Sequence, residues 1–250
     1  MPRPADPEQS LDLPPGYTLV ALRELGDAFA HACEIASEAG AGTLVWVRRY
    51  DLVEFAVVLE PDEPLATARR AFFAGMNAVA DAIAAHCPPE REVKFVWPDT
   101  ILFDEGLLGG ARLGWPNDCA EDAIPDWLVF GVILRAADMA HIEEVQAASG
   151  VALLSEGFEM VETDAIIESF SRHLMTGSAR WKEGGFEPIA RDYLDRLPAR
   201  KAGERRGIGG NGDLLVRLPA AKGPPERTSL VEALARAEWY DPQARGPKLG

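Results

Sequence analysis

The stretch that decides the fold is Phe95–Leu113, which reads FVWPDTILFDEGLLGGARL. Apolar and polar residues alternate towards Trp97, Pro98 interrupts the pattern, and a second extended run continues to Phe103. Alternation with a period of two is typical of a half-buried strand, and Asp104-Glu105-Gly106 between two such runs is typical of a tight turn. The stretch therefore predicts strand, turn and returning strand.

The returning strand contains the pair Gly109-Gly110. Glycine inside a strand weakens it, because glycine loses more backbone freedom on folding than any other residue and offers no side chain for packing. We therefore expect another backbone or a ligand to come close to this pair.

The segments on both sides of this hairpin predict further strands and helices. Nearly continuous apolar runs, typical of buried strands, occupy Thr43–Val47, Val53–Leu59 and Trp127–Leu134. Apolar residues recur at helical spacing in Leu25–Ala39, in Ala66–His86, in a stretch that starts near Thr163, and in Phe186–Leu197. Together these elements predict an α+β fold, a mixed sheet with helices packed mainly on one face.

The C-terminal part predicts a small module. Gly207–Gly212 matches GxGxxG, but a charged linker precedes it, a strand follows it, and Asn211-Gly212 is a favoured hairpin pair. We therefore interpret it as a turn and not as a dinucleotide loop. The expected organisation is a flexible lead-in over residues 1–16, a main domain over 17–200 and a small C-terminal β-containing module over 207–250.

Composition narrows the partners and the compartment. The 250 residues carry 25 basic and 40 acidic side chains, a net charge of −15 that repels nucleic-acid phosphates and anionic membranes. We expect neither as a partner. Three cysteines form no CxxC and no metal-type spacing with the histidines, and the proline-rich N-terminus has no apolar signal-peptide region. We therefore expect reduced thiols and a cytoplasmic protein without a metal site.

Trp97-Pro98-Asp99-Thr100 and Gly109-Gly110-Ala111-Arg112 together carry a family resemblance. They resemble the central motif of the biotin/lipoate protein ligases, in which a Gly-Gly-Ile-Leu-type run lies about a dozen residues after the tryptophan of Trp-Pro-Asn-Asp. The resemblance covers most of residues 15–200 and implies the ligase-like, class II synthetase-like form of the α+β fold.

The resemblance also implies an activity. Ligases of this family use ATP to activate biotin or a lipoyl/octanoyl-type acid, and then attach the acyl group to a lysine of a carrier protein. ATP, such a small carboxylic ligand, and a biotinyl or lipoyl carrier domain are therefore the ligands and partners that the resemblance implies.

The chain departs from the family where the family handles charge. Val96 and Leu107 stand at positions expected to be lysine, and Arg48-Arg49-Tyr50-Asp51 replaces a longer Gly-Arg-Gly-Arg-type loop. Loss of one such group typically costs about 3 kcal/mol or more of transition-state stabilisation. Three hypotheses follow: a ligase with an altered site, a non-catalytic relative that binds a small acyl ligand or a carrier domain, or an interaction scaffold without a ligand.

Four arginines lie where the family meets its ligand, and a guanidinium can hold a carboxylate or phosphate with two hydrogen bonds. They predict a pocket for a small carboxylate or a nucleotide anion. The alternative is that the arginines pair with Asp27, Asp99 or Glu54 inside a decayed site. No catalytic residue is assigned, and the candidate ligand-binding residues are Arg48, Arg49, Trp97, Asp99, Gly109, Gly110, Arg112 and Arg135.

Overall fold

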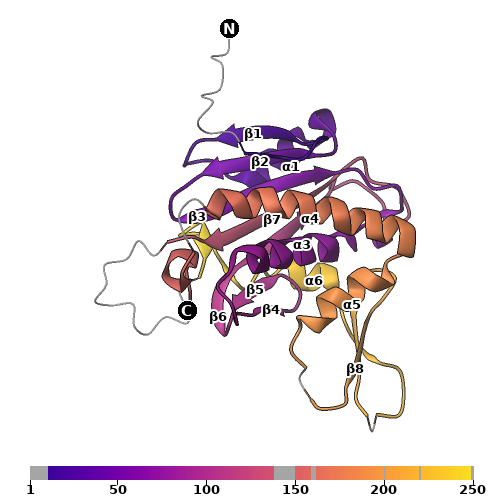
Figure 1. Ribbon diagram of the computed structural model, residues 1–250. Coiled ribbons are helices and arrows are strands. Elements are labelled where there is room, and N and C mark those ends of the chain that lie inside the picture. The colour runs from indigo at the N-terminus through magenta and orange to yellow at the C-terminus, as the bar shows by residue number, and fades with distance from the viewer. Residues whose placement is uncertain (1–10, 138–149, 159–161, 200, 220, 249–250) are drawn as a thin grey trace.

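The structure is a computed structural model that describes residues 11–137, 150–158, 162–199, 201–219 and 221–248 (Figure 1). Among these residues, seven strands form the main sheet, in the order β1-β2-β3-β7-β6-β5-β4. Strand β1 pairs with β2 in parallel and the other neighbours are antiparallel, so the sheet is mixed, as predicted. In sheet order the strands are β1 Thr18–Leu22, β2 Thr43–Arg48, β3 Leu52–Leu59, β7 Leu128–Arg135, β6 Gly106–Gly114, β5 Thr100–Phe103 and β4 Val93–Val96.

The predicted central hairpin is confirmed. Strands β5 and β6 pair from Phe103 opposite Gly106, and Asp104 in the turn has a φ of 52°. A cis peptide bond between Trp97 and Pro98 separates β4 from β5. The motif thus forms a meander at one edge of the sheet, and its last strand, β6, lies against the buried strand β7.

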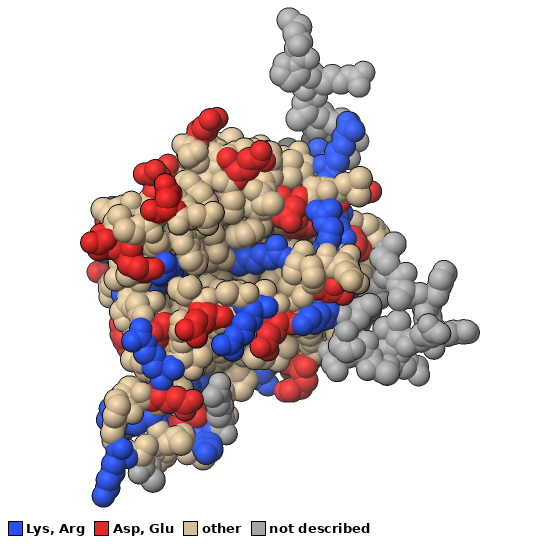
Figure 2. Space-filling model, turned by 180° about the vertical axis from the view of Figure 1, so that it is seen from behind, with Lys and Arg blue, Asp and Glu red and all other residues tan. Residues whose placement is uncertain are grey.

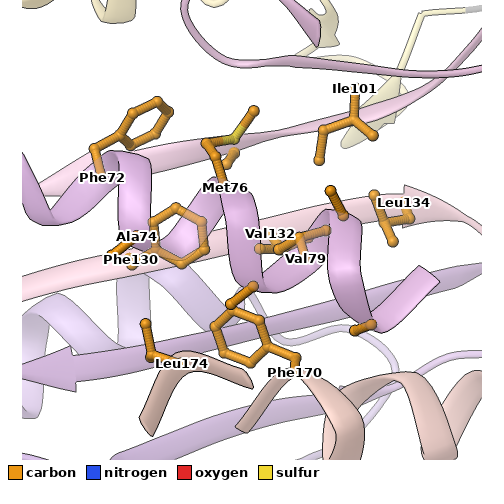
Figure 3. Packing of buried hydrophobic residues seen from close by; sticks show 14 of the residues in the cluster. Phe72, Ala74, Met76, Val79, Ile101, Phe130, Val132, Leu134, Phe170 and Leu174 are labelled. Carbon is orange, nitrogen blue, oxygen red and sulfur yellow. The ribbon is translucent and has the colours of Figure 1, made fainter. Parts of the chain in front are cut away.

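One face of the sheet is covered by four helices: α2 Leu65–Ala68, α3 Ala71–His86, α4 Glu162–Gly184 and α5 Glu187–Asp195. Helices α3 and α4 lie side by side over the strands (Figure 1). Their apolar faces meet β7 in a layer of aromatic and aliphatic side chains that includes Phe72, Phe130 and Phe170 (Figure 3). This layer is the main core of the molecule.

The long helix expected over Ala66–His86 is in fact two helices. The backbone amides of Arg70, Phe72 and Phe73 bond to carbonyls three residues earlier, so the α-helical pattern is interrupted. The guanidinium of Arg69 is buried, pairs with Glu121 at 2.6 Å and stacks on Trp115. Burial of this ion pair accompanies the break, a tertiary contact that helical periodicity does not report.

The second face of the sheet is covered by α1, Ala28–Ala39, which follows the N-cap residue Asp27. Ala28, Ala32 and Ala36 are buried on this helix and pack with the valines of β2 and β3. Small side chains allow the helix axis to approach the sheet closely. The helix covers only part of this face, and the remainder carries the site described below.

The C-terminal part begins with a three-stranded antiparallel sheet, β8 Arg205–Ile208, β9 Leu214–Arg217 and β10 Glu226–Thr228. The glycine-rich stretch is the β8–β9 hairpin turn, with Gly212 at a φ of 88°, so the prediction of a turn is confirmed. Leu214 of β9 and Leu230 belong to the same core as the main sheet. The remaining elements are the 3-10 turn η3 Leu153–Glu156, α6 Leu230–Leu234, β11 Tyr240–Asp241 and β12 Gly246–Pro247.

None of the described helices has both the length and the apolar character that a bilayer crossing requires.

Candidate functional site

The site lies on the sheet face opposite α3 and α4, beside α1. On this face Gly110 of β6 pairs with Ile133 of β7, and Arg112 pairs with Gly131. A Cβ built on Gly131 would lie 2.7 Å from the ring of Phe29 in α1, so this side of the two strands faces α1. Figure 2 shows the molecule from behind the view of Figure 1, and basic side chains lie there among groups of acidic ones.

The two glycines of β6 are approached by different groups. A Cβ on Gly109 would lie 2.1 Å from the carbonyl oxygen of Ile133, and one on Gly110 would lie 2.4 Å from the indole of Trp239. At Gly109 the neighbour is the backbone of β7, as expected. At Gly110 the backbone carbonyl oxygen of Asp99 comes close as well, at 2.6 Å, but the nearest group is a side chain, the tryptophan from the C-terminal part.

Residues 239–248, which we call the C-terminal strap, cover this part of the sheet. The strap is a short β11–β12 hairpin that begins with Trp239, whose side chain is 2% exposed. Arg135 donates from Nη2 to the carbonyl oxygens of Pro247 and Lys248, each at 2.9 Å. Arg245 donates to the carbonyls of Leu25 and Gly26, just before α1. The strap is thus fastened at both of its sides.

Asp99 anchors the indole of the strap. Its carboxylate is 3% exposed and accepts a hydrogen bond from Trp239 Nε1 at 3.1 Å. Burial raises the pKa of Asp99 to about 6, while the hydrogen bonds from Trp239 and Thr100 oppose the increase. Asp99 is therefore a buried carboxylate with a structural partner, and none of the arginines on this face is that partner.

Arg112 lies between three aromatic rings. Its guanidinium carbon is 3.8 Å from the ring centroid of Tyr240, 5.7 Å from that of Phe29 and 5.8 Å from that of Trp239. Nη2 of Arg112 is buried and has no hydrogen-bond partner among the residues that the structure describes. Cation–π contacts stabilise the charge, but they satisfy no N–H donor.

Arg49 is already paired. It contacts Asp51 at 2.7 Å and Glu54 at 3.7 Å. The Glu54 carboxylate is 3% exposed and accepts from the backbone N–H of Ala28, at the start of α1. Burial raises the pKa of Glu54, although Ala28 and Arg49 both act in the opposite direction. Of the two partners of Arg49, the alternative interpretation of the sequence included Glu54 but not Asp51, which makes the shorter contact.

The structure does not bring all eight candidate residues together. Arg48 is exposed and stacks on Trp46, a member of the helix-side core. Trp97 also packs on the helix side, with its ring centroid 5.8 Å from that of Phe73 and 5.9 Å from that of Tyr193. The residues that gather at the strap are Arg49, Asp99, Gly110, Arg112 and Arg135.

Three residues of the site were missed by sequence reasoning: Phe29, Trp239 and Tyr240. Trp239 and Asp99 are 140 residues apart in the chain, and no spacing or motif links them. Leu107, at a position where the resembled family has lysine, packs instead with the small apolar cluster around Trp239. In the part of the chain that the structure describes, no three His, Cys, Asp or Glu side chains gather as a metal site.

Comparison of the sequence with known families identifies the family of this chain. The sequence profile described as the Biotin/lipoate A/B protein ligase family matches residues 13–195 of the chain. The chain belongs to this family. The resemblance seen in the Trp-Pro and Gly-Gly motifs is thereby confirmed, and this member of the biotin/lipoate ligase family is a ligase-like protein.

Individual relatives of this ligase-like protein agree with the assignment. Biotin–[acetyl-CoA-carboxylase] ligase of Paracoccus denitrificans is 24% identical over 227 residues, which cover 86% of this chain and 91% of the relative. A biotin protein ligase-like protein of unknown function from Silicibacter sp. is 26% identical, with a TM-score of 0.74, over 90% of this chain and 99% of its own.

A biotin protein ligase from Aquifex aeolicus, solved in complex with biotin and ATP, shares the fold at lower similarity. It is 14% identical, with a TM-score of 0.58, over 84% of this chain and 94% of its own. The predicted ligase-like α+β fold is therefore confirmed.

Proposed function

We propose that this ligase-like protein binds a small carboxylic or acyl ligand beside the C-terminal strap, with Arg112 receiving the carboxylate. The observation that carries the proposal is the buried Nη2 of Arg112, which has no acceptor among the described residues. Leaving a buried donor unpaired costs about 1–3 kcal/mol, and more for a charged group. A carboxylate would accept that N–H and balance the charge.

The aromatic surroundings suit an acid with an apolar tail. Phe29 and Tyr240 lie on the guanidinium of Arg112 and offer apolar ring surface next to the charge. An acyl chain could pack against these rings while its carboxylate meets the arginine. Biotin, lipoate and octanoate all combine a carboxylate with an apolar chain, and they are the ligands that the family suggests.

The described residues support binding better than adenylation. Activating an acid with ATP places negative charge on several phosphate oxygens, which usually requires more than one cation. Arg49 is engaged by Asp51 and Glu54, and Arg135 holds two carbonyls of the strap. Only Arg112 on this face has a buried donor without a partner among the described residues. We therefore favour a non-catalytic binding role over ATP-dependent acyl transfer to a carrier lysine.

Calorimetric titration tests the binding proposal. Biotin, lipoate, octanoate and ATP are each titrated into the wild type, Arg112→Ala and the control Arg48→Ala, whose side chain lies on the opposite face. A hydrogen bond to a charged group contributes about 1.5–3 kcal/mol, so Arg112→Ala should weaken binding of the acid by about tenfold to a hundredfold. Arg48→Ala should bind like the wild type. Equal binding by wild type and Arg112→Ala, or binding by neither, would refute the proposal.

Acyl-adenylate formation separates the two functions. Each acid is incubated with the wild type, ATP and Mg²⁺, and pyrophosphate release is followed. Release that depends on both the acid and ATP would establish the family's ligase chemistry. Acid binding without release is the outcome expected for a non-catalytic relative.

A further inference from the structure

The indole of Trp239 leaves no free layer above Gly110. A Cβ on this glycine would lie 2.4 Å from Cδ2 and Cε2 of Trp239, whereas non-bonded carbons rest about 3.5–4.0 Å apart. Leu52, Ile133 and Leu107 complete an apolar cluster around the ring. A flat ligand ring cannot lie on the glycine while Trp239 stays in place.

Trp239 is a fixed part of the site. The side chain is 2% exposed, donates to Asp99, and belongs to a strap that Arg135 and Arg245 fasten from two sides. A tryptophan side chain buries roughly 150–250 Å² of surface. A form in which the indole is exposed to water should therefore be about a thousandfold or more less populated than the closed form. A ligand that required this opening would bind weaker by the same factor.

We infer that Trp239 determines which acids the site accepts: slim, unbranched acyl carboxylates at Arg112, and not fused-ring acids such as biotin. This inference rests on the proposed function and names its ligand class. We place an unbranched chain along Phe29 and Tyr240, the rings next to Arg112, and away from Gly110. A fused bicycle is rigid and wide, and the surface over Gly110 is already covered by the indole.

The experiment compares octanoate with biotin on the wild type and Trp239→Ala by calorimetry. The wild type should bind octanoate and show no binding of biotin, or binding at least tenfold weaker than that of Trp239→Ala. Adding Arg112→Ala to Trp239→Ala should abolish the gained biotin binding, which places both acids at one site. Trp181→Ala is the matched control, because it truncates a partly buried tryptophan on the helix side and should leave the preference unchanged.

Each outcome is decisive. If wild type and Trp239→Ala bind biotin equally, or if folded Trp239→Ala gains no biotin binding, the inference is overturned while the binding function stands. If neither protein binds either acid, the proposed function fails and the inference fails with it. Should Trp239→Ala not fold, Trp239→Leu keeps an apolar side chain in the cluster but vacates the outer ring, and the same gain of biotin binding is expected.

Discussion

Replacing Gly110 with alanine is the sharpest test of how β6 meets the strap. The new methyl group would lie 2.4 Å from two indole carbons of Trp239 and 2.6 Å from the carbonyl oxygen of Asp99. Ordinary carbon contacts are about 3.5 Å or longer, so the indole or the strand has to move by about 1 Å. The Asp99 carbonyl cannot retreat freely, because it accepts a hydrogen bond from the backbone N–H of Ala111 at 2.9 Å.

Overpacking a tight interior costs about 1–3 kcal/mol, and a backbone clash places Gly110→Ala near the upper value. Urea denaturation followed by circular dichroism measures the loss. Gly177→Ala is the control, because Gly177 lies within α4 and a Cβ there meets nothing within 4 Å. That exchange should stabilise the protein by up to about 1 kcal/mol through helix propensity.

A double-mutant cycle assigns the clash to the indole. In a Trp239→Ala background the methyl group of Gly110→Ala no longer meets the indole, while its contact with the Asp99 carbonyl remains, so its cost should fall by about 1 kcal/mol or more. The packing of Trp239 on the glycine is refuted if the free energy of unfolding of Gly110→Ala lies within about 0.5 kcal/mol of the wild-type value. It is also refuted if the exchange costs the same in both backgrounds.

Three further predictions concern buried groups. Burial raises the pKa of Asp99 to about 6, so the native protein holds a proton that the unfolded chain releases near pH 4, and stability falls as pH rises from about 4 to 6. In urea melts, the free energy of unfolding of the wild type should fall by less than about 3 kcal/mol between these pH values. Asp99→Asn should remove this dependence on pH. Glu54→Gln keeps an acceptor for Ala28 and should change stability by less than about 1 kcal/mol, whereas Glu54→Leu leaves that N–H unpaired and should cost about 1–3 kcal/mol in the same assay. Phe170→Ala empties a fully buried ring position between two other phenylalanines and should cost about 3–5 kcal/mol by thermal and urea denaturation.

The fold was readable from the sequence because its signals are local. Continuous apolar runs identified β2, β3 and β7, and the Asp104-Glu105-Gly106 turn identified the β5–β6 hairpin. Each of these depends on neighbours within a few residues. The break between α2 and α3 was not readable, because the partner of Arg69 is Glu121, 52 residues later, and nothing in the helical pattern reports it.

The site was readable only in part, for the same physical reason. Gly109-Gly110 predicted a close approach, because glycine inside a strand usually marks one. No local pattern identified the approaching group. Trp239 follows all strands of the main sheet and of the three-stranded C-terminal sheet along the chain, so its contact with Gly110 is long-range. Arg48 and Arg49 are adjacent in sequence, yet they end on opposite sides of the sheet, because Arg48 still follows the alternation of β2.

The three arginines on the site face have different roles. Arg49 is neutralised by two carboxylates and Arg135 is used to hold the strap, so both have become parts of the scaffold. Of these three arginines, only Arg112 keeps a buried donor that the described residues leave unpaired. We propose that the described residues of this face hold one carboxylate at Arg112, with apolar rings around the cation and an indole over Gly110.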